Sequence, residues 1–446
     1  MKDNTSAKTL FRFGLAAYFA LALATSFCHY SLLDSRVEEV CLSLHEQVLN
    51  DAAPAPIQYR ILTYYAAEGL MKLGLSFEAA NFLLRFAFTF LSAAALHYFL
   101  AFWFAPVVCL AGSLFFLAAL PVAYIGYYMQ PMDLPNLFFL LAGCILILKR
   151  KDLWLIPLVT LAMLNRETAI LIVLIYAFVR FDELELKDLA LRSGLIFAAG
   201  MLTYWFLRKA FELKPNYSDL YFLDFNLKDL RTYAYALALF GPLIPLSLWK
   251  YGEKPKFIRR ALLFVPFFVI IHYTIAIMTE PRLWLPVLPF LLAAGLWAVV
   301  PEELKIKTQE PEKVKPSFLT KFPKTAYLSL LLCFLVFFTG FCSYYEKLHF
   351  ADRERQKRVE EVIAVSREYS AKGLSERALE ELNKGLVLGP ENADIRLELA
   401  IIYRNSVRDY AKALYYFRET LNLNPYHIDK KRILREIALL EQAVKK

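Results

Sequence analysis

Carboxylates and arginines that could do chemistry lie in short polar segments between long apolar runs of the sequence. Arginine forms bidentate hydrogen bonds with phosphate, and a carboxylate shielded from water can act as a general base. The pattern predicts a site in which arginines hold an anionic donor while a carboxylate deprotonates an acceptor. The candidate catalytic residues are Asp34, Glu38, Glu39 and Asp133, and the candidate substrate-binding residues are Arg60, Arg166, Glu167, Glu280 and Arg282.

Arg166 and Glu167 stand out because the surrounding run, from Leu153 to Val179, holds no other charge. A charge at the depth of the bilayer core costs about 2.5–3.5 kcal/mol on insertion scales. The pair is therefore either away from that depth or functional.

Each candidate also has a non-catalytic interpretation, and the sequence leaves both open. The first acidic segment can be a solvated loop, and Asp133 can be the N-cap of the helix that follows it. Arg166 and Glu167 can form structural ion pairs, with one another or with neighbours. Glu280 and Arg282 can anchor the end of a membrane span.

Common catalytic and metal-binding motifs are missing from the sequence. No P-loop, GxSxG, HExxH or GxGxxG pattern occurs, so cytosolic nucleotide chemistry is not supported. The six cysteines have no paired CxxC spacing, and the lone His97 and His272 lie in apolar runs, where packing is the commoner role. No metal site is predicted.

The composition is that of a membrane protein: 58% of the 446 residues are hydrophobic and 21% are charged. The net charge of +9 comes from basic clusters between apolar runs, which indicates membrane topology rather than nucleic-acid binding. The run 13–33 lacks a small-residue cleavage site, so we expect a retained span rather than a signal peptide. The predicted spans are 13–33, 78–104, 106–127, 135–149, 188–208, 232–249, 260–278, 282–300 and 325–344, with 153–179 ambiguous.

Lysine and arginine, which favour the cytoplasmic side, decide the ambiguous run. Lys2, Lys8 and Arg12 predict a cytoplasmic N-terminus. A single crossing by 153–179 would place two later basic clusters outside, whereas two short helices that turn near Asn165 keep both inside. The clusters are Lys250, Lys254, Lys256, Arg259 and Arg260, and Lys305, Lys307, Lys313, Lys315, Lys321 and Lys324.

The two arms of this hairpin span only ~17 Å each at 1.5 Å per residue. We expect Asn165 and Thr168 to serve as turn and cap residues. The turn should lie below the outer surface, where charges are tolerated only against protein or water. The candidate residues would then converge on an outward-facing cavity.

The segment from Asp352 onward is charged and helical in pattern. Residues 375–390 align with 410–425 at a spacing of 35, which pairs Ala378 with Ala413 and Pro390 with Pro425. This resembles the tetratricopeptide repeat of about 34 residues, with one extra residue in the Asn405–Asp409 turn. Helices at 353–371 and 427–444 would complete a stacked module, and a generic pair of helical hairpins is the alternative.

The membrane part resembles the GT-C class of polytopic glycosyltransferases over roughly residues 1–300. The resemblance rests on four features: an acidic outer loop with interfacial helices (34–74), a second acidic outer turn at Asp133, the charged hairpin LNRETA, and the arginine beside prolines in EPRLWLPVLP. It implies inverting transfer of a hexosyl or pentosyl group from a polyprenyl-phosphate carrier to an acceptor outside the cytoplasm. The carrier phosphate would contact arginines.

The resemblance also implies an outer-loop carboxylate as the base, which by position is Asp34, Glu38 or Glu39. The first loop lacks an adjacent Asp-Glu pair, so the choice among the three stays open. Some members hold a divalent cation with acidic loop residues, and nothing in this sequence assigns one. The implied partners are the lipid-linked donor, membrane lipid, and an acceptor or protein bound by the repeat module.

The predicted fold class is therefore all-α: a polytopic transmembrane bundle of about 11 membrane segments in residues 1–348, then a helical-repeat domain in 349–446. We expect a bacterial inner-membrane protein with an extracytoplasmic repeat domain. A transporter or flippase of lipid-linked sugars is an alternative, which predicts mid-membrane charges and inverted repeats. A scaffold that presents the repeat module is another, although it needs far fewer spans.

Overall fold

The computed structural model describes residues 2–31, 35–123, 131–214, 221–306, 358–390, 392–424, 427 and 429–444, and their side chains except those of 2–10, 31–39 and 444. Throughout these ranges the fold is all-α, as predicted, with one isolated β-bridge between Phe104 and Lys305. The predicted span 325–344 and the domain boundary after residue 348 lie outside the described residues.

The chain divides into two compact units. The first comprises Met1–Glu38 and Val48–Ser329, and the second comprises Glu39–Gln47 and Leu330–Lys446. Each unit is described by itself below.

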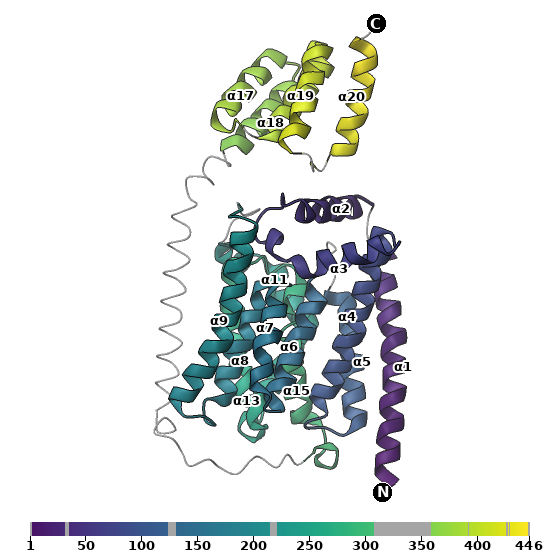
Figure 1. The fold of residues 1–446 in the computed structure, drawn as a ribbon, viewed down its shortest axis with the longest axis vertical. Coiled ribbons are helices and arrows are strands. Elements are labelled where there is room, and N and C mark those ends of the chain that lie inside the picture. The colour runs from purple at the N-terminus through teal and green to yellow at the C-terminus, as the bar shows by residue number, and fades with distance from the viewer. Residues whose placement is uncertain are drawn as a thin grey trace. The chain divides into compact units, whose positions relative to one another are not determined.

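The first unit is a bundle of apolar helices (Figure 1). Helix α3 lies crosswise to the long helices at one end of the bundle (Figure 1). The helices, apart from a central hairpin, are α1 (Lys2–Ser31), α2 (Ser35–Leu49, divided between the units), α3 (Ile61–Lys72), α4 (Phe77–Leu100), α5 (Pro106–Ala123), α6 (Asp133–Leu148), α9 (Leu186–Ala210), α10 (Leu223–Lys228), α11 (Leu230–Phe240), α12 (Leu243–Leu248), α13 (Lys256–Leu262), α14 (Phe264–Ile275) and α15 (Leu288–Val299).

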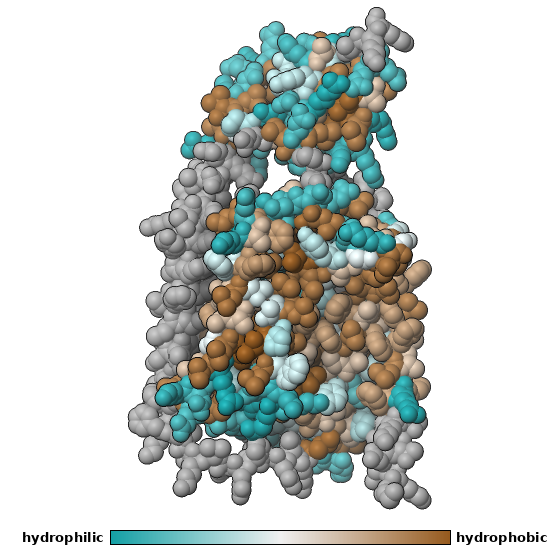
Figure 2. All heavy atoms as spheres, in the orientation of Figure 1, coloured by the Kyte–Doolittle hydropathy of each residue, from teal (hydrophilic) through white to brown (hydrophobic). Residues whose placement is uncertain are grey.

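Five helical segments in the described part of the chain are long and apolar enough to cross a membrane: Phe11–Tyr30, Phe77–Leu100, Pro106–Ala123, Leu186–Ala210 and Lys256–Ile275. The outward faces of α1 and α9 are apolar, because Phe13, Phe27, Leu202 and Phe206 are all more than half exposed. Figure 2 shows apolar residues along the sides of the bundle and a hydrophilic band at its lower end. This surface suits a lipid environment.

The ambiguous run 153–179 forms two short helices, which confirms the predicted hairpin. α7 (Leu155–Met163) and α8 (Leu171–Arg180) are joined by a turn that contains the 3₁₀-helix η3 (Glu167–Ile170). The two ends of the hairpin opposite its turn meet, since Arg180 Nη2 lies 2.8 Å from Oδ1 of Asp152, which precedes the first arm. Arg180 is only 3% exposed and also donates to the Ile147 carbonyl oxygen.

Basic residues from distant segments gather at this end of the hairpin, opposite its turn. Glu183 accepts ion pairs from Arg150 at 3.3 Å and from Lys256 at 3.8 Å. Asp182 pairs with Arg260. The loop after α6 and helix α13, whose basic residues the sequence predicts on one side of the membrane, therefore lie at one end of the bundle.

Glycines bring the hairpin close to its neighbours. A Cβ atom on Gly143 of α6 would lie 2.9 Å from Ile172 Cγ2 in α8. A Cβ on Gly200 of α9 would lie 2.8 Å from Ile170 Cδ1 and 3.1 Å from Val159 Cγ1. The hairpin is therefore packed between α6 and α9 so closely that a side chain at either glycine would force Ile172 or Ile170 to shift.

Two predicted spans are interrupted in the structure, and a third contains a single turn residue at position 263. The run 232–249 breaks into α11 and α12 at Gly241, whose φ of +33° few other residues adopt, followed by Pro242. The run 260–278 lies in α13 and α14, and 282–300 begins with the 3₁₀-helix η5 (Pro281–Trp284). The sequence did not predict the breaks at Gly241 and at Pro281–Trp284, because apolar composition does not reveal where glycine and proline interrupt a helix.

The second unit stacks helices 358–371, α17 (Ser375–Leu388), α18 (Ala393–Ile402), α19 (Tyr410–Leu423) and α20 (Lys430–Val444). α18 is central: its Leu399 and Ile402 pack in one apolar core and its Leu397 and Ala400 in another. The aligned alanines Ala378 and Ala413 are both fully buried. A π-helical turn, Tyr403–Val407, lies where the sequence predicts an extra residue.

Candidate functional site

Asp133 is the centre of a buried cluster of charges contributed by four segments of the bundle. Arg166 Nη1 donates to Asp133 Oδ1 at 2.5 Å, and Arg282 Nη1 donates to Oδ1 and Oδ2 at 3.1 and 2.9 Å. The three residues are 5%, 9% and 7% exposed, in the order Asp133, Arg166 and Arg282. Arg282 also pairs with Glu280 through its second terminal nitrogen. Residues separated by up to 149 positions thus share one carboxylate.

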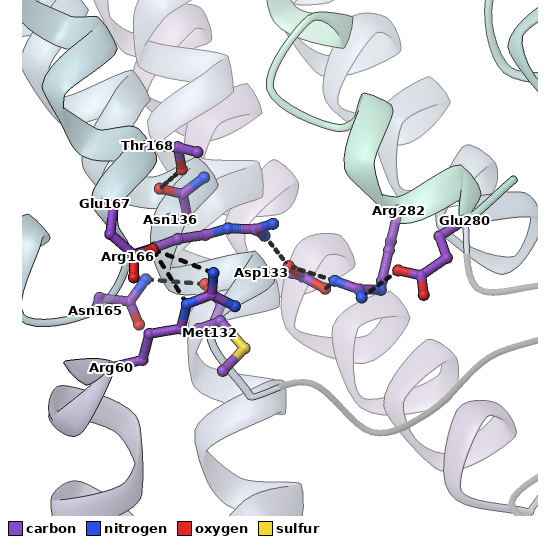
Figure 3. A network of polar contacts seen from close by, with 10 residues as sticks. All are labelled: Arg60, Met132, Asp133, Asn136, Asn165, Arg166, Glu167, Thr168, Glu280 and Arg282. Carbon is purple, nitrogen blue, oxygen red and sulfur yellow. Dashed lines mark hydrogen bonds and ion pairs between the residues drawn. The ribbon is translucent and has the colours of Figure 1, made fainter. Parts of the chain in front are cut away.

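Arg60 and Glu167 form the other side of the cluster. Arg60 Nε and Nη2 lie 3.2 and 3.1 Å from Glu167 Oε2. The backbone reinforces this contact, because Leu62 N donates to the Leu164 carbonyl oxygen at 2.9 Å. Figure 3 shows Arg166 reaching from the hairpin turn toward Asp133, with Arg60 and Glu167 to one side and Arg282 and Glu280 to the other.

The hairpin turn is held against α6 by side-chain hydrogen bonds. Asn165, fully buried, donates from Nδ2 to the Met132 carbonyl oxygen at 2.9 Å. Thr168 donates to Asn136 Oδ1 at 3.3 Å (Figure 3). η3 has no side-chain cap, so the prediction that Thr168 caps a helix was wrong. Both side chains instead fix Arg166 relative to Asp133.

The turn that carries Glu280 and Arg282 is held by Asn226, which sequence reasoning missed. Asn226 is fully buried and donates to the carbonyl oxygens of Tyr273 and Ala276 at 2.8 and 2.7 Å. Its Oδ1 accepts from Met278 N at 2.8 Å. The only signal in the sequence was one asparagine within a mixed polar and apolar segment, which is too weak to single it out.

The structure tests two of the non-catalytic interpretations. Asp133 is the first residue of α6, whose N-cap is Met132, and no side chain caps that helix. Arg166 and Glu167 form ion pairs with neighbours, Asp133 and Arg60 respectively, so the structural ion-pair interpretation agrees with the structure. Both charges are therefore tied to other helices.

Six of the nine predicted site residues lie in this cluster: Arg60, Asp133, Arg166, Glu167, Glu280 and Arg282. Of the other three, Asp34 lies outside the described residues, and Glu38 and Glu39 are in α2 with side chains outside the description. Whether the first acidic segment faces the cluster therefore stays a prediction.

The cluster is electrically balanced, with three arginines and three carboxylates. Among the described residues, the buried atoms Arg166 Nε and Glu167 Oε1 have no hydrogen-bond partner. Leaving such atoms without a partner costs about 1–3 kcal/mol each in a closed protein interior. The cluster thus has both a donor and an acceptor available for a ligand.

Metal binding has no support from the described side chains, among which no group of three or more His, Cys, Asp or Glu could hold an ion. The carboxylates of Asp133, Glu167 and Glu280 are each engaged by arginine instead. His97 bonds to Tyr18 at 2.7 Å, and His272 stacks on Phe268 with ring centroids 3.8 Å apart. Both histidines have packing roles.

Comparison of the chain with protein-family models, with curated proteins and with solved structures gave no match. The site alone therefore carries the functional argument.

Proposed function

We propose that this protein is a membrane glycosyltransferase of the GT-C type, which moves a sugar from a polyprenyl-phosphate donor to an extracytoplasmic acceptor. The observation that carries the proposal is the pair of buried arginines, Arg166 and Arg282, held on one carboxylate. Because these arginines are already held in place, each can donate two hydrogen bonds to a phosphate with little further loss of side-chain conformational entropy. An apolar bundle around them suits a donor with a lipid tail.

Transport and scaffolding have less support. Asp133, Arg166 and Arg282 come from the start of α6, a hairpin turn and η5, so they lie at helix ends. A substrate path would instead place charges from several spans near the middle of the membrane. A scaffold would not need a buried cluster of six charged residues. We propose that the second unit, with its stacked helices, binds the acceptor or a protein partner.

The proposed topology places the end of the hairpin opposite its turn in the cytoplasm, because basic residues gather there. About 11 membrane segments then leave the repeat module outside the cytoplasm, in a bacterial inner membrane. A reporter fused after Lys446 is expected to be active outside, and one fused after Lys151 inside. A cytoplasmic signal from the Lys446 fusion would overturn the topology and the outward-facing site.

Transfer itself tests the function most directly. Membranes that contain the protein should move sugar from a polyprenyl-phosphate donor to an acceptor, and Arg282→Lys should lower the rate by about 10- to 100-fold. Lysine keeps the charge but cannot bond both oxygens of Asp133 and also Glu280, as Arg282 does. The rate is measured with radiolabelled donor at equal protein levels.

The matched control is Arg231→Lys, because Arg231 is exposed and pairs only locally, with Asp229. This variant should retain the wild-type rate. Wild-type membranes without transfer from any polyprenyl-phosphate sugar would refute the proposed function, and an Arg282→Lys variant with full activity would remove Arg282 from the site.

A further inference from the structure

A second charged region lies at the end of the hairpin opposite its turn, where positive charges outnumber negative ones. The ion pairs described above join segments 149–152, 180–192 and 250–260 there. These segments contain eleven lysines and arginines and six carboxylates. Helix α13, which begins within the last segment, lies at the lower end of the bundle in Figure 1, where Figure 2 shows a hydrophilic band. This end of the bundle therefore carries a net positive charge.

The carboxylates of this region are more buried than the arginines around them. The side chains of Asp152 and Glu183 are 13% and 17% exposed, and the buried Arg180 joins them through ion pairs at 2.8 and 2.5 Å. Arg150 and Arg192 are 54% and 48% exposed, and each contacts one of these carboxylates through one terminal nitrogen at 3.3 Å. No further hydrogen bond or ion pair of either side chain occurs in the described part of the chain. Their remaining donors can therefore bind an anion.

Exposed apolar side chains flank the same two arginines. Leu153 and Trp154, which lie between the basic segment 149–152 and α7, are both more than half exposed. Leu191 and Leu195 of α9, on either side of Arg192, are also more than half exposed. The ion pair of Arg192 with the loop before α7 brings the two apolar groups close together. Tryptophan is typical of the interface between bilayer and water, so this surface fits a phospholipid better than free phosphate.

We propose that Arg150 and Arg192 bind the phosphate of an anionic phospholipid, and that the four exposed apolar side chains contact its acyl chains. A guanidinium can donate two hydrogen bonds to a phosphate. Phosphatidylglycerol suits this surface because its headgroup has no ammonium, whereas the ammonium of phosphatidylcholine is repelled by the surrounding basic residues. The binding does not depend on sugar transfer, because it occurs at the opposite end of the hairpin from the cluster around Asp133.

The test measures binding of phosphatidylglycerol and of phosphatidylcholine, with the same acyl chains, to the purified full chain by native mass spectrometry. The wild type should bind phosphatidylglycerol about 10-fold more tightly. Arg150→Gln and Arg192→Gln should each weaken phosphatidylglycerol about 5- to 10-fold and leave phosphatidylcholine unchanged. Wild-type protein with no preference between the two lipids would overturn the proposal.

Lys187→Gln is the matched control, because it removes the same charge from an exposed position on the same helix. It should bind both lipids like the wild type. A Lys187→Gln variant that loses as much phosphatidylglycerol affinity as Arg192→Gln would show that the preference comes from diffuse surface charge, which refutes a specific site.

Thermal unfolding separates lost binding from lost folding. In phosphatidylcholine alone, Arg150→Gln and Arg192→Gln should unfold near the wild-type midpoint, because Arg180 still joins the two carboxylates. Added phosphatidylglycerol should raise the midpoint of the wild type and of Lys187→Gln more than the midpoints of the two arginine variants. Arginine variants that lose both lipids equally would have a structural role instead and would overturn the site.

Discussion

Asp133→Asn is expected to lower the free energy of unfolding by about 3–5 kcal/mol and to abolish sugar transfer. The change leaves two guanidinium groups, each less than a tenth exposed, without the carboxylate that both contact. Asparagine fills the same space, so the fall in the free energy of unfolding reflects the lost charge rather than a change in packing. The measurement is the midpoint of thermal unfolding in detergent, with transfer assayed at a temperature where the variant is folded.

A second variant separates stability from function. Asp133→Asn combined with Arg166→Gln removes one of the two stranded charges, so it should recover part of the lost stability. Transfer should stay absent, because Arg166 is also gone. A single Asp133→Asn variant with the wild-type unfolding midpoint would contradict the view that these ion pairs hold the four segments together.

Removing the general base is expected to lower kcat by about 100- to 10,000-fold. Asp133 is poorly suited to that role, since its two oxygens already accept three hydrogen bonds from arginines. The base should therefore be one of Asp34, Glu38 and Glu39. Of Asp34→Asn, Glu38→Gln and Glu39→Gln, one is expected to show the large fall in kcat with little change in the KM for the donor.

Glu46→Gln is the control for this set, because Glu46 also lies on α2 and is no candidate for the site. It should transfer at the wild-type rate. Full transfer by all three loop variants, each inserted at the wild-type level, would place the base elsewhere and remove the main expectation drawn from the GT-C resemblance.

The hairpin could be predicted from the distribution of charges, whereas the breaks within apolar runs could not be predicted. The two basic clusters excluded a single crossing by residues 153–179, and the structure has α7 and α8 there. By contrast, the break at Gly241 and Pro242 divides a run whose composition suits one span. Hydropathy reports how much apolar surface a segment offers, and it is insensitive to where the backbone bends.

The charged members of the site were predictable for a similar reason. A charge within an apolar run is costly, so Arg166 and Glu167 were conspicuous. Asn226 was not, because an asparagine outside the apolar runs carries no such cost. Its role depends on partners far along the chain, Tyr273, Ala276 and Met278, and no local spacing encodes such contacts.

The close packing at Gly143 and Gly200 determines which parts of the site can move. The hairpin is wedged between α6 and α9, tied at one end by Arg180 and at the other by Asn165. Arg166 is therefore expected to keep its position when a substrate binds. Arg60 and Arg282 lie on separate segments, ahead of α3 and within η5, so entry of a substrate is expected to displace these two arginines while the hairpin stays still.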